Sequence, residues 1–170
     1  RLGRESEAAA AAARAAAGQD TNVTEKAQLV RGLIADDSGD HATLASVAAY
    51  FATLTGKIPD SWTADAREIA ARNLLATAGS SQTAWQDAMQ AATIRQTRVD
   101  YRDMARALGV AARAADRSGN AQAAAQLYAR ASQSARQAGD TVAADRWAKQ
   151  AGSAADVDPF VEPAAPARKK

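Results

Sequence analysis

Residues 102–140, RDMARALGVAARAADRSGNAQAAAQLYARASQSARQAGD, contain the pattern that decides the fold. Apolar residues recur in this stretch at steps of three and four, which places their side chains on one face of an α-helix. Glycine takes the left-handed backbone conformation that ends a helix, and asparagine caps the start of the next. The stretch therefore predicts two antiparallel helices joined at Ser118-Gly119-Asn120 and ending at Gly139-Asp140. The apolar positions are Met104, Leu108, Ala111, Ala112 and Ala115 in the first helix and Ala124, Tyr128, Ala131 and Ala135 in the second.

This pattern of small apolar residues around a Gly-Asn turn resembles a tetratricopeptide repeat, in a longer-helix variant of about 40 residues. Three positions depart from the family pattern: Leu108 replaces an aromatic residue, Ala112 replaces a glycine, and the closing proline is absent. The resemblance implies stacked helical hairpins whose first helices line a concave groove for a partner protein. It places Arg106, Gly109, Arg113, Asp116 and Arg117 at groove-facing positions.

Glycines in short polar turns divide the rest of the chain into similar lengths. Gly39, Gly79, Gly119 and Gly139 are spaced by 40, 40 and 20 residues. Weaker breaks fall near the remaining multiples of 20, at Gln19-Asp20, at 56–60 around Pro59 and at 97–100. A helix and turn every 20 residues, paired every 40, is typical of stacked helical hairpins.

The residues after these glycines repeat as well. Leu44, Ala48 and Phe51 follow Gly39 at the offsets at which Ala124, Tyr128 and Ala131 follow Gly119, and Trp85, Met89 and Ala92 are shifted by one position. We therefore expect an all-α, right-handed stack of antiparallel hairpins, a TPR-like α-solenoid. Its hairpins would span 20–58, 59–98 and 99–138, with a C-terminal capping helix to about residue 153. A helical bundle without repeats is the alternative.

The two ends differ in composition from the middle. Residues 1–19 form an alanine-rich leader, helical or frayed, with a tether as the alternative, and 20–155 form the repeat domain. Asn22 and Glu25 have the spacing of a capping box at the first domain helix. Residues 156–170 hold three prolines and no periodicity, which predicts a disordered tail with a docking motif around Phe160 as the alternative. A processed N-terminus would indicate the periplasm or cell envelope, and otherwise we expect a cytoplasmic protein.

The composition includes few residues suited to catalysis or metal binding. The chain has no cysteine and one histidine, His41, and a formal net charge of +2. His41 follows three aspartates, of which Asp40 is better explained as a helix cap than as a metal ligand. Neither a nucleophile motif nor a phosphate-binding glycine loop occurs. We therefore expect no enzyme activity, no cofactor, no metal site and no membrane-spanning helix.

Arginines form the clearest candidate site. Arg102, Arg106, Arg113 and Arg117 lie opposite the apolar face of their helix, and Arg67 joins them from an earlier helix. With Asp116 they are our predicted partner-binding residues, because guanidinium groups bind carboxylates bidentately. The simplest alternative is the solvated side of a helix, and a surface for nucleic acid or anionic lipid is another.

Together these features predict a non-enzymatic protein-interaction module or assembly adaptor that binds a protein or acidic peptide in a groove. A structural subunit, or a tethered lipoprotein, of an envelope or secretion assembly is an alternative function. The same arginines would serve a nucleic-acid or anionic-surface binder, for which affinity would fall steeply with added salt.

Overall fold

A computed structural model describes residues 2–18, 20–54 and 60–152, except for the side chains of residues 2–5, 60 and 61. Within these ranges the chain forms helices and turns and no strand, which confirms the all-α prediction. The predicted break at 56–60 lies outside the described residues, except for Asp60 at the start of α4. The predicted tail at 156–170 lies entirely outside them. The helices are α1 (Leu2–Ala16), α2 (Thr21–Ser38), α3 (His41–Leu54), α4 (Asp60–Ala76), α5 (Ser81–Thr97), α6 (Tyr101–Arg117), α7 (Ala121–Gln137) and α8 (Thr141–Ala151).

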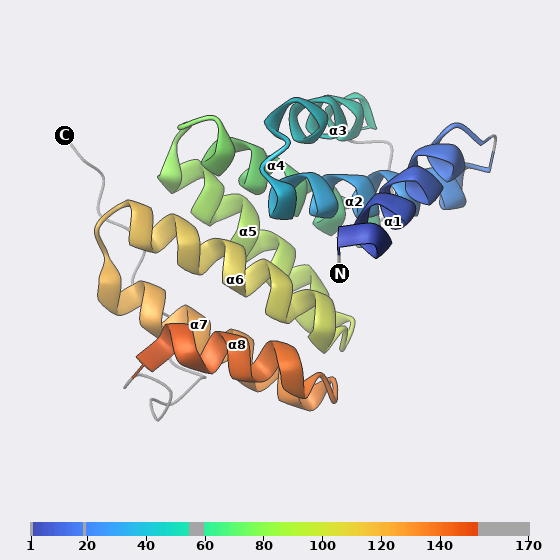
Figure 1. Cartoon of the computed structure of the whole chain (residues 1–170). Coiled ribbons are helices and arrows are strands. Elements are labelled where there is room, and N and C mark those ends of the chain that lie inside the picture. The colour runs from blue at the N-terminus through green and yellow to red at the C-terminus, as the bar shows by residue number, and fades with distance from the viewer. Residues whose placement is uncertain (1, 19, 55–59, 153–170) are drawn as a thin grey trace.

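Each helix packs against the next one in the chain, from α1 to α8. Figure 1 shows this order as a progression across the molecule from the blue to the orange helices. Helices two apart also touch, since α2 contacts α4 and α4 contacts α6. Side chains from α2, α4 and α6 can therefore meet although they are far apart in sequence.

Several of these helices are followed by a residue in the left-handed backbone conformation. Gly39, Gly119 and Gly139 have φ of 73°, 82° and 72°, which confirms their predicted role in the turns. The turn at Gly79 is different, because Ala78 takes the left-handed conformation there with φ of 56°. The break near residue 100 uses Val99 in the same way, with φ of 59°.

Polar residues after the turns cap the following helices. The side chains of Asp40, Asn120 and Asp140 accept hydrogen bonds from the backbone N–H groups of Thr43, Ala123 and Ala143, at 3.0, 3.1 and 3.0 Å. These bonds satisfy donors that a helix start leaves unpaired, and the one at Asp40 confirms the predicted cap.

The predicted capping box at the start of α2 is wrong. Asp20 is the N-cap, and its carboxylate accepts bonds from the N–H groups of Asn22 (2.9 Å) and Val23 (3.2 Å). The helix thus begins before Asn22, because Asp20 already satisfies its first free donors. Glu25 is buried instead of folding back on the helix start.

The core is made largely of alanine. Around Leu108 and Leu127, buried alanines from α4, α5, α6 and α7 form the larger cluster, and Phe51, Leu44 and Ile69 anchor a smaller one between α2, α3 and α4. All five predicted apolar positions of α6 are buried. Because alanine buries little apolar area, the core depends on close approach of the helices.

Two glycines permit such approach between alternate helices. A Cβ on Gly32 of α2 would lie 2.5 Å from Cδ1 of Ile69 in α4, and a Cβ on Gly109 of α6 would lie 2.5 Å from Cη2 of Trp147 in α8. Gly109 is therefore covered by Trp147, and its predicted exposure to a groove is wrong. The reason is that α8 packs on α7, and its Trp147 side chain reaches across to Gly109 of α6.

Candidate functional site

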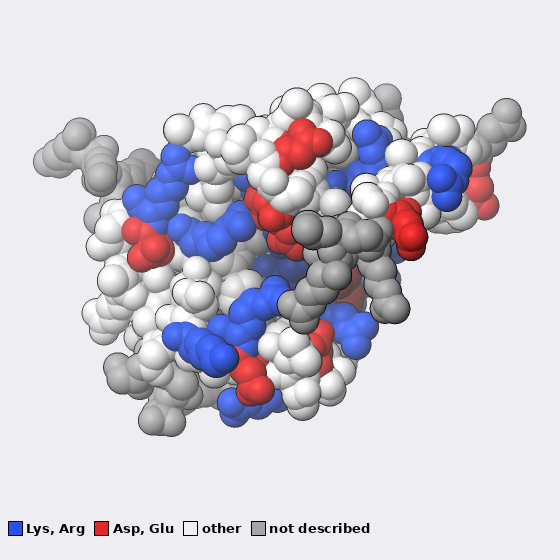
Figure 2. Space-filling view, in the orientation of Figure 1, with Lys and Arg blue, Asp and Glu red and all other residues white. Residues whose placement is uncertain are grey.

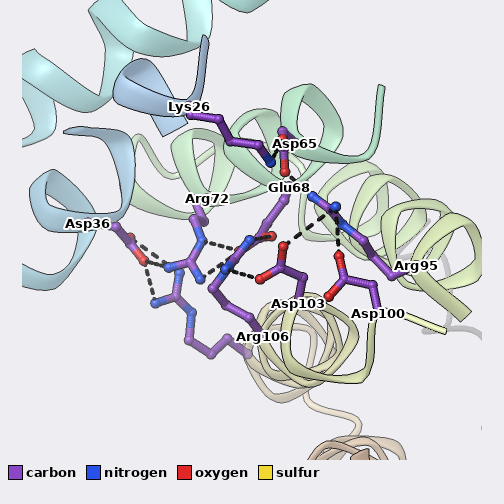
Figure 3. Close-up of polar contacts among 10 residues, drawn as sticks. Lys26, Asp36, Asp65, Glu68, Arg72, Arg95, Asp100, Asp103 and Arg106 are labelled. Atoms are coloured by element: carbon purple, nitrogen blue, oxygen red, sulfur yellow. Dashed lines mark hydrogen bonds and ion pairs between the residues drawn. The ribbon is translucent and has the colours of Figure 1, made fainter. Parts of the chain in front are cut away.

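Charged side chains of α2, α4 and α6 meet in a buried network, which Figure 3 shows. Glu68 of α4 lies at its centre and is fully buried. Arg72 donates to Oε1 of Glu68 through Nε (3.1 Å) and Nη2 (2.9 Å). Arg106 of α6 donates through Nε to Oε1 (2.7 Å) and through Nη2 to Oε2 (3.0 Å). Burial by itself raises the pKa of Glu68, but the two guanidinium groups outweigh it and the pKa is lowered.

Asp36 extends the network to the end of α2. Its carboxylate accepts a bond from Nη1 of Arg72, and bonds from Nη1 (3.0 Å) and Nη2 (3.3 Å) of Arg113 in α6. Asp36 and Arg113 are 77 residues apart in the sequence. One carboxylate thus connects three helices.

Arg95 of α5 organises a second group of acids. It pairs with Asp65, Asp100 (3.1 Å) and Asp103 (3.5 Å), and Lys26 approaches Asp65 at 3.6 Å. Burial nevertheless raises the pKa of Asp65, because desolvation exceeds the attraction of Arg95 and Lys26.

Glu25 of α2 lies near this second group. Its Oε2 atom is buried and has no hydrogen-bond partner among the described residues. Burial raises the pKa of Glu25, and the charge of Asp65 raises it further.

A cavity of about 180 Å³ opens beside the network. Its lining comes entirely from the alternate helices α2, α4, α6 and α8. The residues are Leu33, Asp37, Arg72, Arg106, Val110, Arg113, Arg146 and Trp147. We call this cavity the arginine pocket. In Figure 2, Lys and Arg side chains gather along α6 and α8, with fewer acidic groups between them.

The arginines of this pocket differ in what they already bind. Arg72 and Arg106 are held by Glu68, and Arg113 by Asp36. Arg146 is exposed and has no acidic partner in the described part of the chain. Trp147 completes the wall, with its ring stacked on Tyr128 at 5.7 Å between centroids. The pocket therefore combines guanidinium groups with an apolar wall.

The predicted site residues are only partly brought together. Arg106 and Arg113 line the pocket, whereas Arg67 pairs with Asp87 of α5 at 2.9 Å. Arg102 is exposed near Asp140, and Arg117 donates to the backbone carbonyl of Leu75. Asp116 is exposed at the end of α6.

The simplest alternative for the arginine stripe, a solvated helix face, does not hold for Arg106 and Arg113. Both are partly buried, because α4 supplies Glu68 and α2 supplies Asp36 against this side of α6. Arg102 and Arg117 are exposed, as expected for the solvated face of a helix.

Sequence reasoning missed Arg72 and Arg146. The spacing of Glu68 and Arg72, four residues apart among apolar positions of one helix, is a signal that could have pointed to a buried pair. No comparable signal distinguishes Arg146, whose place in the pocket follows from the packing of α8 on α7 at the end of the chain of helices.

In the described ranges no cluster of histidines, aspartates and glutamates is arranged to hold a metal ion. Nor does any helix there have the length and apolar character needed to cross a bilayer. Comparison with protein-family models, with curated proteins and with solved structures finds no match to this chain.

Proposed function

We propose that this chain is a non-enzymatic protein-interaction module, an adaptor that holds an acidic segment of a partner protein at the arginine pocket. The observation that carries the proposal is the convergence of four arginines from α4, α6 and α8 around one cavity with an apolar wall. Arginine binds carboxylates through two parallel hydrogen bonds, and the internal acids hold Arg72 and Arg106 in fixed orientations. Arg146 and Arg113 are the two arginines that can turn to bind the partner's carboxylates.

The proposal includes a TPR-like stack of helical hairpins with α8 as its cap. The contacts of α2 with α4 and α4 with α6 support this arrangement, as do the close approaches at Gly32 and Gly109. In such a stack the first helices of successive pairs form one face. The lining of the arginine pocket by α2, α4, α6 and α8 fits that face.

A nucleic-acid surface is the less favoured function. Binding to a phosphate backbone uses rows of unneutralised cations, whereas Glu68, Asp36 and Asp103 already neutralise Arg72, Arg106 and Arg113. Salt distinguishes the two functions, because counterion release makes nucleic-acid affinity fall steeply with added salt. A peptide that contacts two arginines and an apolar wall should lose less affinity.

The test is an array of short peptides of matched length that differ in charge. We expect retention of acidic peptides that contain an apolar residue, and its loss in Arg113→Glu/Arg146→Glu. The matched control is Arg98→Glu/Arg136→Glu, which reverses the same charge at two exposed positions outside the pocket. Equal retention by the pocket variant and the control would contradict the proposal. Circular dichroism establishes that both variants remain helical.

A further inference from the structure

Asp36 occupies an unusual position for a buried acid. It lies in the last turn of α2, where the helix dipole disfavours negative charge, and its side chain is only 8% exposed. It is held there by Arg72 and Arg113, which contribute three hydrogen bonds from two other helices. The placement of Asp36 therefore depends on the arginines at the wall of the pocket.

Arg72 and Arg113 differ in how firmly they are held beside Asp36. Arg72 is 7% exposed and is also held by Glu68 through two bonds. Arg113 is 40% exposed, and Asp36 is its acidic partner in the described structure. If Arg113 turned away, Asp36 would keep its bond from Arg72, so no buried charge would be left unpaired.

We propose that Asp36 is an internal substitute for the partner's carboxylate. In the free chain it binds Arg113 beside the pocket, and on binding it releases Arg113 to the incoming acid while it remains bound to Arg72. This inference rests on the proposed function and assigns different roles to the pocket arginines. Arg113 is exchanged between an internal and an external carboxylate, whereas Arg72 and Arg106 stay in the network. Asp36 thereby lowers affinity for weak anions and links partner binding to the α2–α6 contact.

The test measures fluorescence anisotropy of a labelled hexaglutamate peptide with the full chain. Asp36→Asn should bind the peptide about five-fold more tightly than wild type. This is the size of effect expected when one partly exposed charge pair no longer competes with the peptide. Asp37→Asn is the matched control, because Asp37 also lines the pocket and its removal deletes the same charge without freeing Arg113. Each variant is then combined with Arg113→Gln. The gain from Asp36→Asn should disappear in that background, whereas any gain from Asp37→Asn should persist.

The outcomes separate this inference from the proposed function. If the peptide binds wild type and the gain from Asp36→Asn survives in Arg113→Gln, the exchange is wrong and the binding function stands. If the peptide binds neither wild type nor Asp36→Asn, both are overturned. Arginine side-chain NMR of the wild-type chain gives a measurement that needs no variant. Added peptide should shift the guanidinium signal of Arg113 and leave that of Arg72 in place, and the opposite result would overturn the exchange.

Discussion

At the scale of single residues, Val99 has the least suitable side chain for its backbone. Its φ of 59° places it in the left-handed region, and it is 64% exposed. A β-branched residue is strained in this conformation, which glycine adopts readily at the equivalent turns at Gly119 and Gly139.

Val99→Gly should therefore stabilise the fold by about 1 kcal/mol, since it relieves this strain and removes no buried contact. Val142→Gly is the control, because Val142 is 70% exposed but helical, and there glycine should destabilise by about 0.3–0.5 kcal/mol, the difference between the helix propensities of valine and glycine. Urea unfolding measures both. A Val99→Gly variant less stable than wild type would show that the strain is absent.

Glu25 is a second residue whose environment opposes its charge. Its pKa is raised in the folded chain, so the native state binds this proton more tightly than the unfolded state does. The charged form thus weakens the fold at pH values above the raised pKa. This penalty fades as the pH falls from the raised pKa to the ordinary pKa of glutamate, and it is absent below the ordinary pKa.

Glu25→Gln should accordingly raise the melting temperature at pH 7 and have little effect near pH 4. Thermal unfolding of both proteins across this range tests the sign. A stabilisation that grows toward acid pH would contradict the assigned cause.

At the scale of helices, Glu68 connects α4 and α6. Breaking a buried charge pair leaves uncompensated charge, which typically costs about 3–5 kcal/mol. Glu68→Ala should lower the free energy of unfolding by about 3 kcal/mol, the lower end of this range, because Arg72 and Arg106 lose their shared carboxylate but keep Asp36 and Asp103.

The control for Glu68 is Asp87→Ala, which breaks the more exposed pair with Arg67 and should cost less than about 1 kcal/mol. Denaturant unfolding compares the two variants. Equal losses would mean that the buried network contributes no more than a surface pair.

The contact of α8 with α6 depends on the missing side chain at Gly109. A methyl group there would overlap the Trp147 ring, so Gly109→Ala should destabilise by about 1–3 kcal/mol. Combining it with Trp147→Leu removes the overlap, and a double-mutant cycle should then show coupling between the sites. Additive losses would contradict the packing of Trp147 on Gly109.

The helices themselves could be predicted because their signals are local. Gly39, Gly119 and Gly139 carry turn signals on their own positions, and apolar spacing marks the buried faces. Val99 carries no such signal, since valine rarely ends a helix this way. The carboxylates of Glu68 and Asp36 lie 38 and 77 residues from Arg106 and Arg113. Helical spacing within α6 can therefore reveal Asp103 as a partner of Arg106, three residues away, but neither of these two acids.

At the scale of the whole molecule, an alanine-rich core brings helices close and leaves few large side chains to fix their relative positions. The buried ion pairs between α2, α4 and α6 supply directional contacts on one side, and the arginine pocket lies beside them. We infer that the same arginines that connect the alternate helices make this side suited to an acidic partner.

The most direct measurement is a ¹H–¹⁵N NMR titration of the chain with hexaglutamate. We expect the shifted signals to come from α2, α4, α6 and α8 around the pocket, including the indole N–H of Trp147 and the side chain of Arg146. Shifts confined to α3, α5 and α7, or no shifts at peptide concentrations that saturate the anisotropy signal, would contradict it.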